Sequence, residues 1–197
     1  MAQVLSRANY TVMPWKNGRG TTSQIAIDST QSQFPDNFLW RVSSASVVSN
    51  DHFSIFDGYQ RALLVVEGNG LWLNDVELKP FVPYFFSGSE AVDCNLISGP
   101  VVDLGIIFKA HEVQVRVEIL RANTIELAGN VGIQFLYLAQ GQAVFAGGVL
   151  NKGDTLKIET SDNIQLTGNS LIGVLSSISI TSTEPVEESP LRDDKIF

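Results

Sequence analysis

The sequence predicts an all-β protein whose strands form a sandwich or a barrel. Three observations predict it: β-branched and aromatic residues recur in short runs, the runs end at Gly, Asn, Asp or Pro, and amphipathic helical periodicity is scarce. The spacing of these runs is typical of sandwiches and barrels. The expected strands are residues 24–28, 40–48, 61–66, 70–73, 101–108, 113–120, 133–139, 143–146, 155–159 and 171–180.

The composition places the chain among globular proteins. Of its 197 residues, 44% are hydrophobic and 17% are charged, which is enough apolar material for a sizeable core. No charge-free apolar run approaches the ~20 residues that a membrane-spanning helix needs. The formal net charge of −8 provides no basic surplus to replace the counterions of a polyanion. We therefore expect neither a membrane nor a nucleic-acid partner.

The cysteine usage and the N-terminal residues both favour a cytoplasmic protein. Cys94 is the single cysteine, so the chain has no internal disulfide and no cysteine cluster for zinc. Its apolar context predicts a buried structural thiol. Arg7, Asn9 and Tyr10 interrupt any apolar run that could serve as a secretion signal.

Turn residues predict hairpins that recur along the chain. Gly-rich and Asn-containing turns separate apolar runs near residues 67–75 and again near 140–148, where left-handed backbone is easily adopted. We interpret the recurrence as one supersecondary unit used twice, although two unrelated hairpin regions can also align by chance. An offset of 73 residues pairs Gly68 with Gly141, Trp72 with Phe145, Val76 with Val149 and Lys79 with Lys152.

The polar, glycine-rich run at residues 15–22 is the first candidate for an anion site. Residues 1–61 hold five basic and four acidic side chains, whereas the remainder of the chain is strongly acidic. Within that segment, residues 15–22 offer a cation, an amide, two hydroxyls and flexible backbone N–H groups, which together can bind a carboxylate or a phosphate. The run lacks the Gly-Lys-Ser/Thr order of a Walker A loop.

Three charged residues within or beside expected strands are further candidates. Strand alternation puts Arg41 and Ser43 on one face, which points either into a barrel or to solvent. Arg61 precedes an apolar run, so it marks a barrel mouth or is an ordinary surface residue. Asp103 lies within an apolar strand and needs a partner, for which Arg41, Arg61 and Lys16 are the candidates.

Metal and nucleophilic chemistry find little support in the sequence. His52 and His111 lie 59 residues apart, without the spacing that brings metal ligands together. We expect a turn at 51–53 and a loop at 111–112. The chain has no G-x-S-x-G motif, and no histidine is near Cys94 in the sequence.

A set of motifs spread over most of residues 9–108 is typical of one known family. The motifs are Met13-Pro14-Trp15-Lys16-Asn17-Gly18, Gly20-Thr21-Thr22, Trp40-Arg41-Val42-Ser43, the turn from Phe53-Ser54 to Gly58, Arg61, Glu67-Gly68 and Gly99-Pro100-Val101-x-Asp103. By these motifs the chain resembles the HutD/Ves family. Beyond about residue 120 the resemblance is confined to the hairpin pattern.

The resemblance implies a cupin-type β-barrel built twice in one cytoplasmic bacterial chain. We expect an N-terminal half over residues 1–110 with the pocket, a C-terminal half over 111–182, and an acidic, flexible tail over 183–197. Family members are associated with histidine utilisation, as binders of an intermediate such as formylglutamate that tune the pathway, and others with stress responses. Carried over by motif, the ligand-binding residues are Trp15, Lys16, Asn17, Thr21, Thr22, Arg41, Ser43, Arg61 and Asp103.

The chain departs from the family pattern at two places. Gly18-Arg19-Gly20 stands where three glycines are usual, and Leu104-Gly105 stands where an aromatic residue and an asparagine usually follow the aspartate. The second departure removes a polar group from the expected pocket. The usual cupin metal ligands are missing as well, so we expect neither a metal nor a cofactor.

The leading hypothesis is a metal-free protein that binds a small carboxylate and regulates metabolism. Arg or Lys would pair with the carboxylate, while Asn17 and the hydroxyl groups orient the ligand. The alternative is an enzyme acting on a carboxylated metabolite, with Lys16 or Asp103 as the catalytic group. A third interpretation is an oligomeric scaffold without a ligand. The sequence also leaves a homodimer open.

Overall fold

The protein is built almost entirely of antiparallel strands. The computed structural model describes residues 2–15, 20–128, 132–159 and 163–181. One 3₁₀ turn, η1 (Arg7–Asn9), is present in these residues. The strands are β1 (Ala2–Leu5), β2 (Thr11–Pro14), β3 (Gly20–Ile27), β4 (Trp40–Val47), β5 (Asp51–His52), β6 (Gln60–Glu67), β7 (Leu71–Leu73), β8 (Val76–Leu78), β9 (Tyr84–Ser87), β10 (Asp93–Leu96), β11 (Val101–Phe108), β12 (Val113–Leu127), β13 (Ile133–Gln140), β14 (Gln142–Phe145), β15 (Gly148–Asn151), β16 (Thr155–Ile158) and β17 (Ile164–Ile180).

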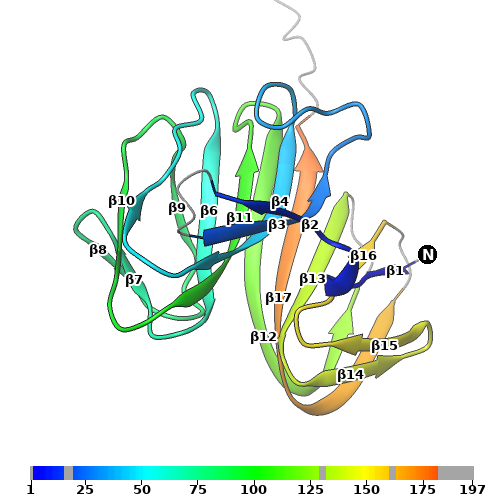
Figure 1. Cartoon of the computed structure of the whole chain (residues 1–197). Helices are drawn as coiled ribbons and strands as arrows, with labels where there is room; N and C mark the ends of the chain where they lie inside the picture. Colours follow the sequence, from blue (N-terminus) through cyan, green and yellow to red (C-terminus); the bar gives the residue numbers. More distant parts are fainter. Residues whose placement is uncertain (1, 16–19, 129–131, 160–162, 182–197) are drawn as a thin grey trace, which may run out of the picture.

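The strands from β2 to β11 form the first of two barrels. A six-stranded sheet has the order β2-β3-β4-β11-β6-β9, and a four-stranded sheet has the order β5-β10-β7-β8. An apolar cluster that includes Val65, Leu71 and Cys94 fills the space where the two sheets meet. Figure 1 shows the smaller sheet on the outer side of the larger one.

The second barrel is made by β1 and by β12 to β17. Its sheet has the order β1-β16-β13-β17-β14-β15, with the long strand β12 paired along β17. Leu and Ile side chains fill its interior, among them Leu136, Leu156 and Leu166, which are fully buried. Strand β1 pairs with β16, so the first residues of the chain belong to the sheet of the second barrel.

A shared core of apolar side chains joins the two barrels, whose strands lie side by side in Figure 1. It takes Trp40, Leu64 and Ile106 from the six-stranded sheet, and Phe135 and Val174 from the second barrel. Because strand side chains alternate, the residues between these core positions on β4, β6 and β11 point away from the shared core, into the first barrel.

The all-β architecture and the cupin-type barrel in two halves are confirmed. Each of the expected strand runs overlaps an observed strand, and the repeat at an offset of 73 is real in three dimensions: Gly68 and Gly141 both have positive φ, at 97° and 89°. The short strands β1, β2, β8, β9, β10 and β15 are absent from the expected set. Asp51-His52, expected as a turn, forms strand β5 instead. Its backbone is extended because the two residues pair with Asp93 and Cys94 on β10. The expected tail at 183–197 lies outside the described residues.

Among the residues that the structure describes, no helix is long and apolar enough to cross a membrane.

Candidate functional site

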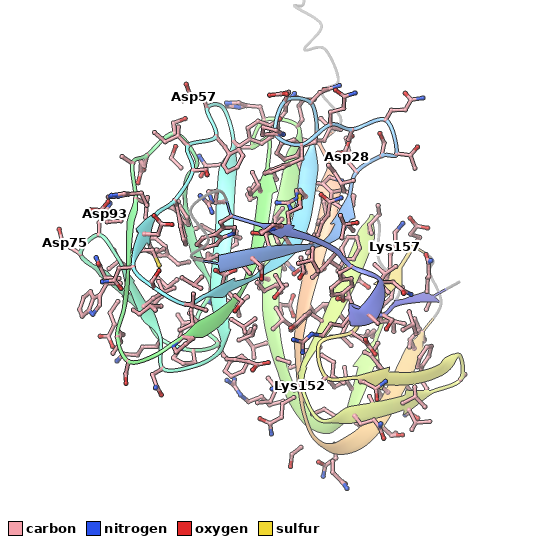
Figure 2. The ribbon with its side chains drawn as sticks, viewed as in Figure 1. Asp28, Asp57, Asp75, Asp93, Lys152 and Lys157 are labelled. Carbon is pink, nitrogen blue, oxygen red and sulfur yellow. The ribbon has the colours of Figure 1, made fainter. Side chains whose placement is uncertain are left out.

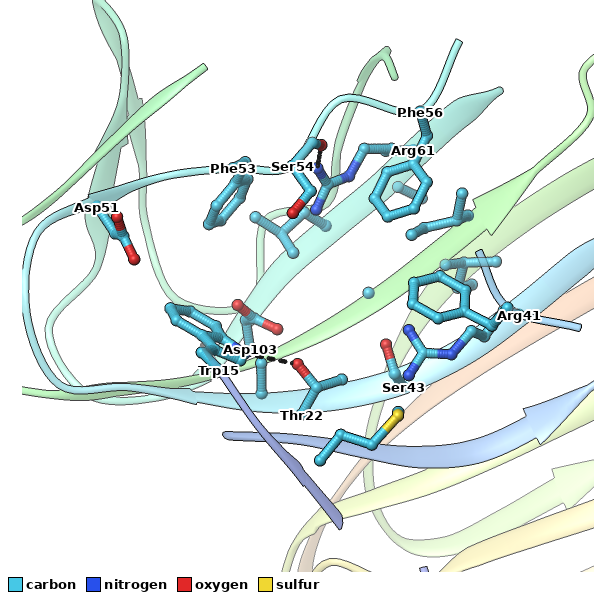
Figure 3. A pocket seen from close by; sticks show the side chains of 18 of the residues that line it. Trp15, Thr22, Arg41, Ser43, Asp51, Phe53, Ser54, Phe56, Arg61 and Asp103 are labelled. Atoms are coloured by element: carbon cyan, nitrogen blue, oxygen red, sulfur yellow. Dashed lines mark hydrogen bonds between the residues drawn. The ribbon is translucent and has the colours of Figure 1, made fainter. Parts of the chain in front are cut away.

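A cavity of about 580 Å³ opens in the first barrel (Figure 3). This volume is in the range of small-molecule pockets. Strands β3, β4, β5, β6 and β11 contribute to its wall, together with the end of β2 and the residue after it. The segment between β3 and β4 and the segment that follows β5 complete the wall. The side chains most relevant to chemistry are Trp15, Thr22, Arg41, Ser43, Asp51, His52, Arg61 and Asp103.

The floor of the cavity is set by the register of three neighbouring strands. Ile107 on the central strand β11 pairs with Arg41 on β4 and with Arg61 on β6. Two residues earlier, Gly105 pairs with Ser43, and a further two residues earlier Asp103 pairs with Ala45. All these positions share one face, so alternation alone brings both arginines and the aspartate into one cavity.

Arg41 is a buried cation. Its side chain is 3% exposed, its Nε donates to Oε1 of Gln24 at 2.8 Å, and its guanidinium carbon lies 3.9 Å from the centre of the Phe34 ring. Its Nη2 is buried without a hydrogen-bond partner in the described part of the chain. Burial lowers the pKa of Arg41 to about 10, because the charged form is poorly solvated.

Arg61 on β6 is held by aromatic rings. Its guanidinium carbon lies 4.7 Å from the ring centre of Phe53, 5.1 Å from that of Phe86 and 5.6 Å from that of Phe56. Its Nη1 donates to the Ser54 carbonyl oxygen at 3.2 Å. Burial lowers the pKa of Arg61 to about 10, although the charge of Asp103 acts in the opposite direction.

Asp103 is a buried carboxyl group at the far end of the floor. Its residue is 4% exposed. Burial raises its pKa to about 7, and Arg61 and a hydrogen bond from the Ala45 backbone offset only part of that rise. Of the three partners expected for Asp103, Arg61 is therefore the one that acts on it in the structure, whereas Lys16 lies outside the described residues.

Trp15 closes one side of the cavity. Its indole Nε1 donates to the Thr22 hydroxyl at 2.8 Å, which joins the end of β2 to β3. Gly20 makes this packing possible, because a Cβ atom there would lie 2.8 Å from Cε3 of Trp15 and 2.7 Å from the Ser46 carbonyl oxygen.

The structure brings most of the expected ligand-binding residues together. Trp15, Thr22, Arg41, Ser43, Arg61 and Asp103 all line the cavity, and both arginines point inward rather than to solvent. Thr21 is adjacent to Thr22 on β3 and is not part of the lining. Lys16 and Asn17 lie outside the described residues. That these side chains bind a ligand stays a prediction.

Sequence reasoning missed the aromatic and acidic part of the wall. Phe34, Phe53 and Phe56 flank the arginines, and Asp51 lies on the side of Asp103 (Figure 3). The clustering of phenylalanines in residues 34–56 was a signal that could have been used, because cations in clefts are often held by aromatic rings. The sequence marked Gly105 as a departure from the family pattern, but it did not indicate that this position opens the middle of the cavity.

The described residues contain no group of three His, Cys, Asp or Glu side chains that could hold a metal ion. His52 bonds through Nδ1 to the Asp93 carboxylate at the surface. Cys94 is fully buried, and burial together with the charges of Asp103 and Asp51 raises its pKa to about 12. Its thiol is therefore protonated at neutral pH and is a poor nucleophile, in line with the structural role expected from the sequence.

Comparisons with known proteins agree with this architecture. An uncharacterized 21.2 kDa protein in the hutC 3′ region of Pseudomonas putida is 36% identical over 121 residues, which are 59% of this chain and 63% of that protein's length. A conserved protein of unknown function from Pseudomonas aeruginosa PAO1 has a TM-score of 0.81 at 29% identity, with 91% of this chain and 99% of that one covered. HutD from Pseudomonas fluorescens SBW25, solved in a formate condition, has a TM-score of 0.78 at 26% identity over 92% and 100% of the two chains.

A family model described as HutD matches residues 7–173, which include every strand that lines the cavity and most of the second barrel. The chain therefore belongs to the HutD family, which is associated with a histidine-utilisation locus.

Proposed function

We propose that the protein binds a small carboxylate-bearing metabolite in the cavity of the first barrel, without a metal, and that occupancy of this site tunes histidine utilisation. The ligand's carboxylate pairs with Arg41, and Ser43 and Thr22 provide hydroxyl groups beside it. The protein is proposed to act in the cytoplasm, where intermediates of histidine breakdown are produced.

The unpartnered guanidinium edge of Arg41 carries this proposal. A charge removed from water costs several kcal/mol unless it is paired, and an Arg–carboxylate pair with two parallel hydrogen bonds is the strongest neutraliser a small molecule can offer. Gln24 accepts the hydrogen bond from Nε and Phe34 covers one face of the group, so among the described residues the buried Nη2 has no hydrogen-bond partner. A neutral amide group of a ligand could accept a hydrogen bond from Arg41, but it would not neutralise the charge of the guanidinium group.

The family supplies the candidate metabolites. The HutD structure from P. fluorescens was solved in a formate condition, and formate is the smallest carboxylate. Formylglutamate, an intermediate of histidine degradation, carries carboxylate groups and is small enough for a cavity of about 580 Å³. Binding regulates a pathway only if the ligand prefers one conformation or one complex of the protein over another. A role in a stress response would use the same site with another carboxylate.

Thermal denaturation with formate, glutarate, glutamate and formylglutamate tests the proposal. A ligand at about 100 times its dissociation constant adds about 2.7 kcal/mol to the free energy of unfolding. In a protein of this size that raises the Tm by about 5–10 °C. We expect such a rise for at least one carboxylate, and we expect Arg41→Gln to abolish it.

Arg116→Gln is the matched control. Arg116 on β12 pairs with Ser177 on β17 as Arg41 on β4 pairs with Ile107 on β11, but Arg116 is exposed on the second barrel. Its substitution should leave the ligand-induced rise in Tm unchanged. A panel in which no carboxylate changes the Tm of the wild-type protein, or in which Arg41→Gln responds like the wild type, would contradict the proposal.

The raised pKa of Asp103 supports a second candidate, an enzyme in which this carboxyl group carries a proton. A pKa of about 7 suits a general acid or base at neutral pH. NMR of formylglutamate incubated with the protein separates the two candidates. Product that accumulates with the wild type and not with Asp103→Asn supports the enzyme, and unchanged ligand in the presence of binding supports the binding protein.

A further inference from the structure

The charges of the cavity are divided between two ends. Figure 3 shows Arg41 and Arg61 on one side of the cavity, with Asp103 and Asp51 on the other. The register agrees for Asp103: both arginines pair with Ile107, and Asp103 lies four residues earlier on β11, or about 13 Å along the strand. The site is therefore polarised, and the proposed carboxylate pairing uses only one of its ends.

The acidic end is defined by groups on several strands. Asp103 lies between Ala45 on β4 and Val65 on β6. The negative charge of Asp103 raises the pKa values of Cys94 on β10 and of Tyr137 on β13, and Asp51 on β5 also acts on Cys94. Besides burial, which is the main cause for Cys94, both carboxyl groups therefore raise the pKa of this thiol, and Arg61 is the cation that offsets Asp103.

Gly105 leaves the path between the two ends open. A Cβ atom at this position would be 3.5 Å from Cδ1 of Leu63 and 3.9 Å from the Ser43 hydroxyl oxygen, with no backbone atom in contact. Any larger side chain here would project into the middle of the cavity, between the arginines and Asp103. With glycine at this place, a ligand can extend from one end to the other.

We propose that Asp103 is a specificity-determining residue, which accepts a hydrogen bond from an N–H or ammonium group at the end of the ligand opposite the carboxylate held by Arg41. This inference rests on the proposed function. It narrows the ligand from small carboxylates in general to carboxylates that also carry an amide or amine, and it disfavours plain dicarboxylates. Asp103 is buried, 4% exposed and part of the cavity wall, so a donor there is sheltered from competing water.

Like-charge repulsion provides the selectivity. A second ligand carboxylate at the acidic end would face Asp103 and Asp51 in a poorly solvated space, so either the ligand or Asp103 would have to take up a proton. An ammonium or amide N–H at the same place forms a charge-assisted hydrogen bond instead. Such a bond discriminates by about tenfold or more, the range measured for hydrogen bonds to charged groups.

Glutarate and 5-aminopentanoate are matched probes of this idea, because they share chain length and differ at one end. Isothermal titration calorimetry at about pH 8.5, where most Asp103 carboxyl groups are ionised, should show 5-aminopentanoate binding the wild type about tenfold or more tightly than glutarate. Asp103→Asn should remove this preference. Asp75→Asn, at an exposed turn of the first barrel (Figure 2), is the control and should keep it.

The pH dependence provides a second measurement that needs no variant at position 103. Because the pKa of Asp103 is raised to about 7, lowering the pH from about 8.5 to about 6 protonates it and should narrow the preference for 5-aminopentanoate. His52 also lines the cavity, so a variant at this position serves as the control. His52→Gln should leave the pH dependence unchanged if Asp103 causes it.

The outcomes separate this inference from the proposed function. Equal binding of both probes by the wild type at each pH, or a preference that survives in Asp103→Asn, overturns the role of Asp103 while the binding function stands. Failure of the wild type to bind either probe, formate or formylglutamate overturns both. If Asp103→Asn does not fold, the pH dependence of the preference for 5-aminopentanoate, measured on the wild type and on His52→Gln, tests the role of Asp103.

Discussion

The two barrels share one hairpin framework, yet one is hollow and the other is filled. On β6 the inward positions are Arg61, Leu63 and Val65, and 73 residues later on β13 they are Gln134, Leu136 and Leu138. The alternate positions of both strands, such as Leu64 and Tyr137, enter the shared core. The repeat therefore preserves which face of the strand enters the shared core, and the two barrels differ in what their interiors contain.

The central strands show how the difference arises. By their pairing with β6 and β13, Gly105 on β11 occupies the place of Leu175 on β17, and Asp103 occupies that of Gly173. In the second barrel Leu175 belongs to the core, and a Cβ atom at Gly173 would lie 2.7 Å from Cδ1 of Leu136. Small and polar residues at a few inward positions thus leave an open cavity where the other barrel has a packed core, while the framework stays the same.

The largest expected effect is a difference in the free energy of unfolding between matched Leu→Ala variants in the filled barrel and in the hollow barrel. Leu136→Ala should lower the free energy of unfolding by about 3–5 kcal/mol, because it opens a void in a close-packed core. Leu63→Ala, its counterpart at the cavity wall, should cost about 1–3 kcal/mol, since the leucine already borders empty space on one side. Chemical denaturation of both variants measures the difference. Equal losses would mean that the two interiors are packed alike.

The next effect concerns binding rather than stability. Gly105→Leu places in the first barrel the residue that the second barrel has at Leu175, so it should fill the cavity. We expect carboxylate affinity to fall by about 100-fold or more, equivalent to about 2.7 kcal/mol. The Tm should be unchanged or higher, because the new side chain buries apolar surface. Gly105→Ala should give an intermediate loss of affinity. Unimpaired binding by Gly105→Leu would place the ligand elsewhere.

The sequence predicted the hairpin framework better than the contents of the barrels. Alternation and turn residues identified β4, β6 and β11, and they placed Arg41 and Ser43 on one face, but whether that face pointed inward depended on the second sheet. The partner of Asp103 and the aromatic contacts of Arg61 join segments far apart in the chain, so no local pattern indicates them. The absence of a side chain at Gly105 became informative only when its neighbours across the sheet were known.

The smallest expected effect tests what holds the two barrels together. Lys152, at the second hairpin of the repeat, bonds to the Glu67 carboxylate on β6 at 2.9 Å, but both side chains are substantially exposed, at 49% and 36%. An exposed ion pair contributes about 0–1 kcal/mol, whereas the shared core contains Trp40, Phe135 and other large buried side chains.

We therefore expect Lys152→Gln to lower the free energy of unfolding by less than about 1 kcal/mol, and the loss to shrink further in high salt. Lys79→Gln is the control, because Lys79 is the exposed counterpart of Lys152 in the first repeat unit. A loss of several kcal/mol in Lys152→Gln would show that the hollow barrel depends on this ion pair for its attachment to the filled one. A loss equal to that of Lys79→Gln would mean that the shared apolar core holds the two barrels together. Attachment through this core allows one barrel to contain a cavity without loosening the other.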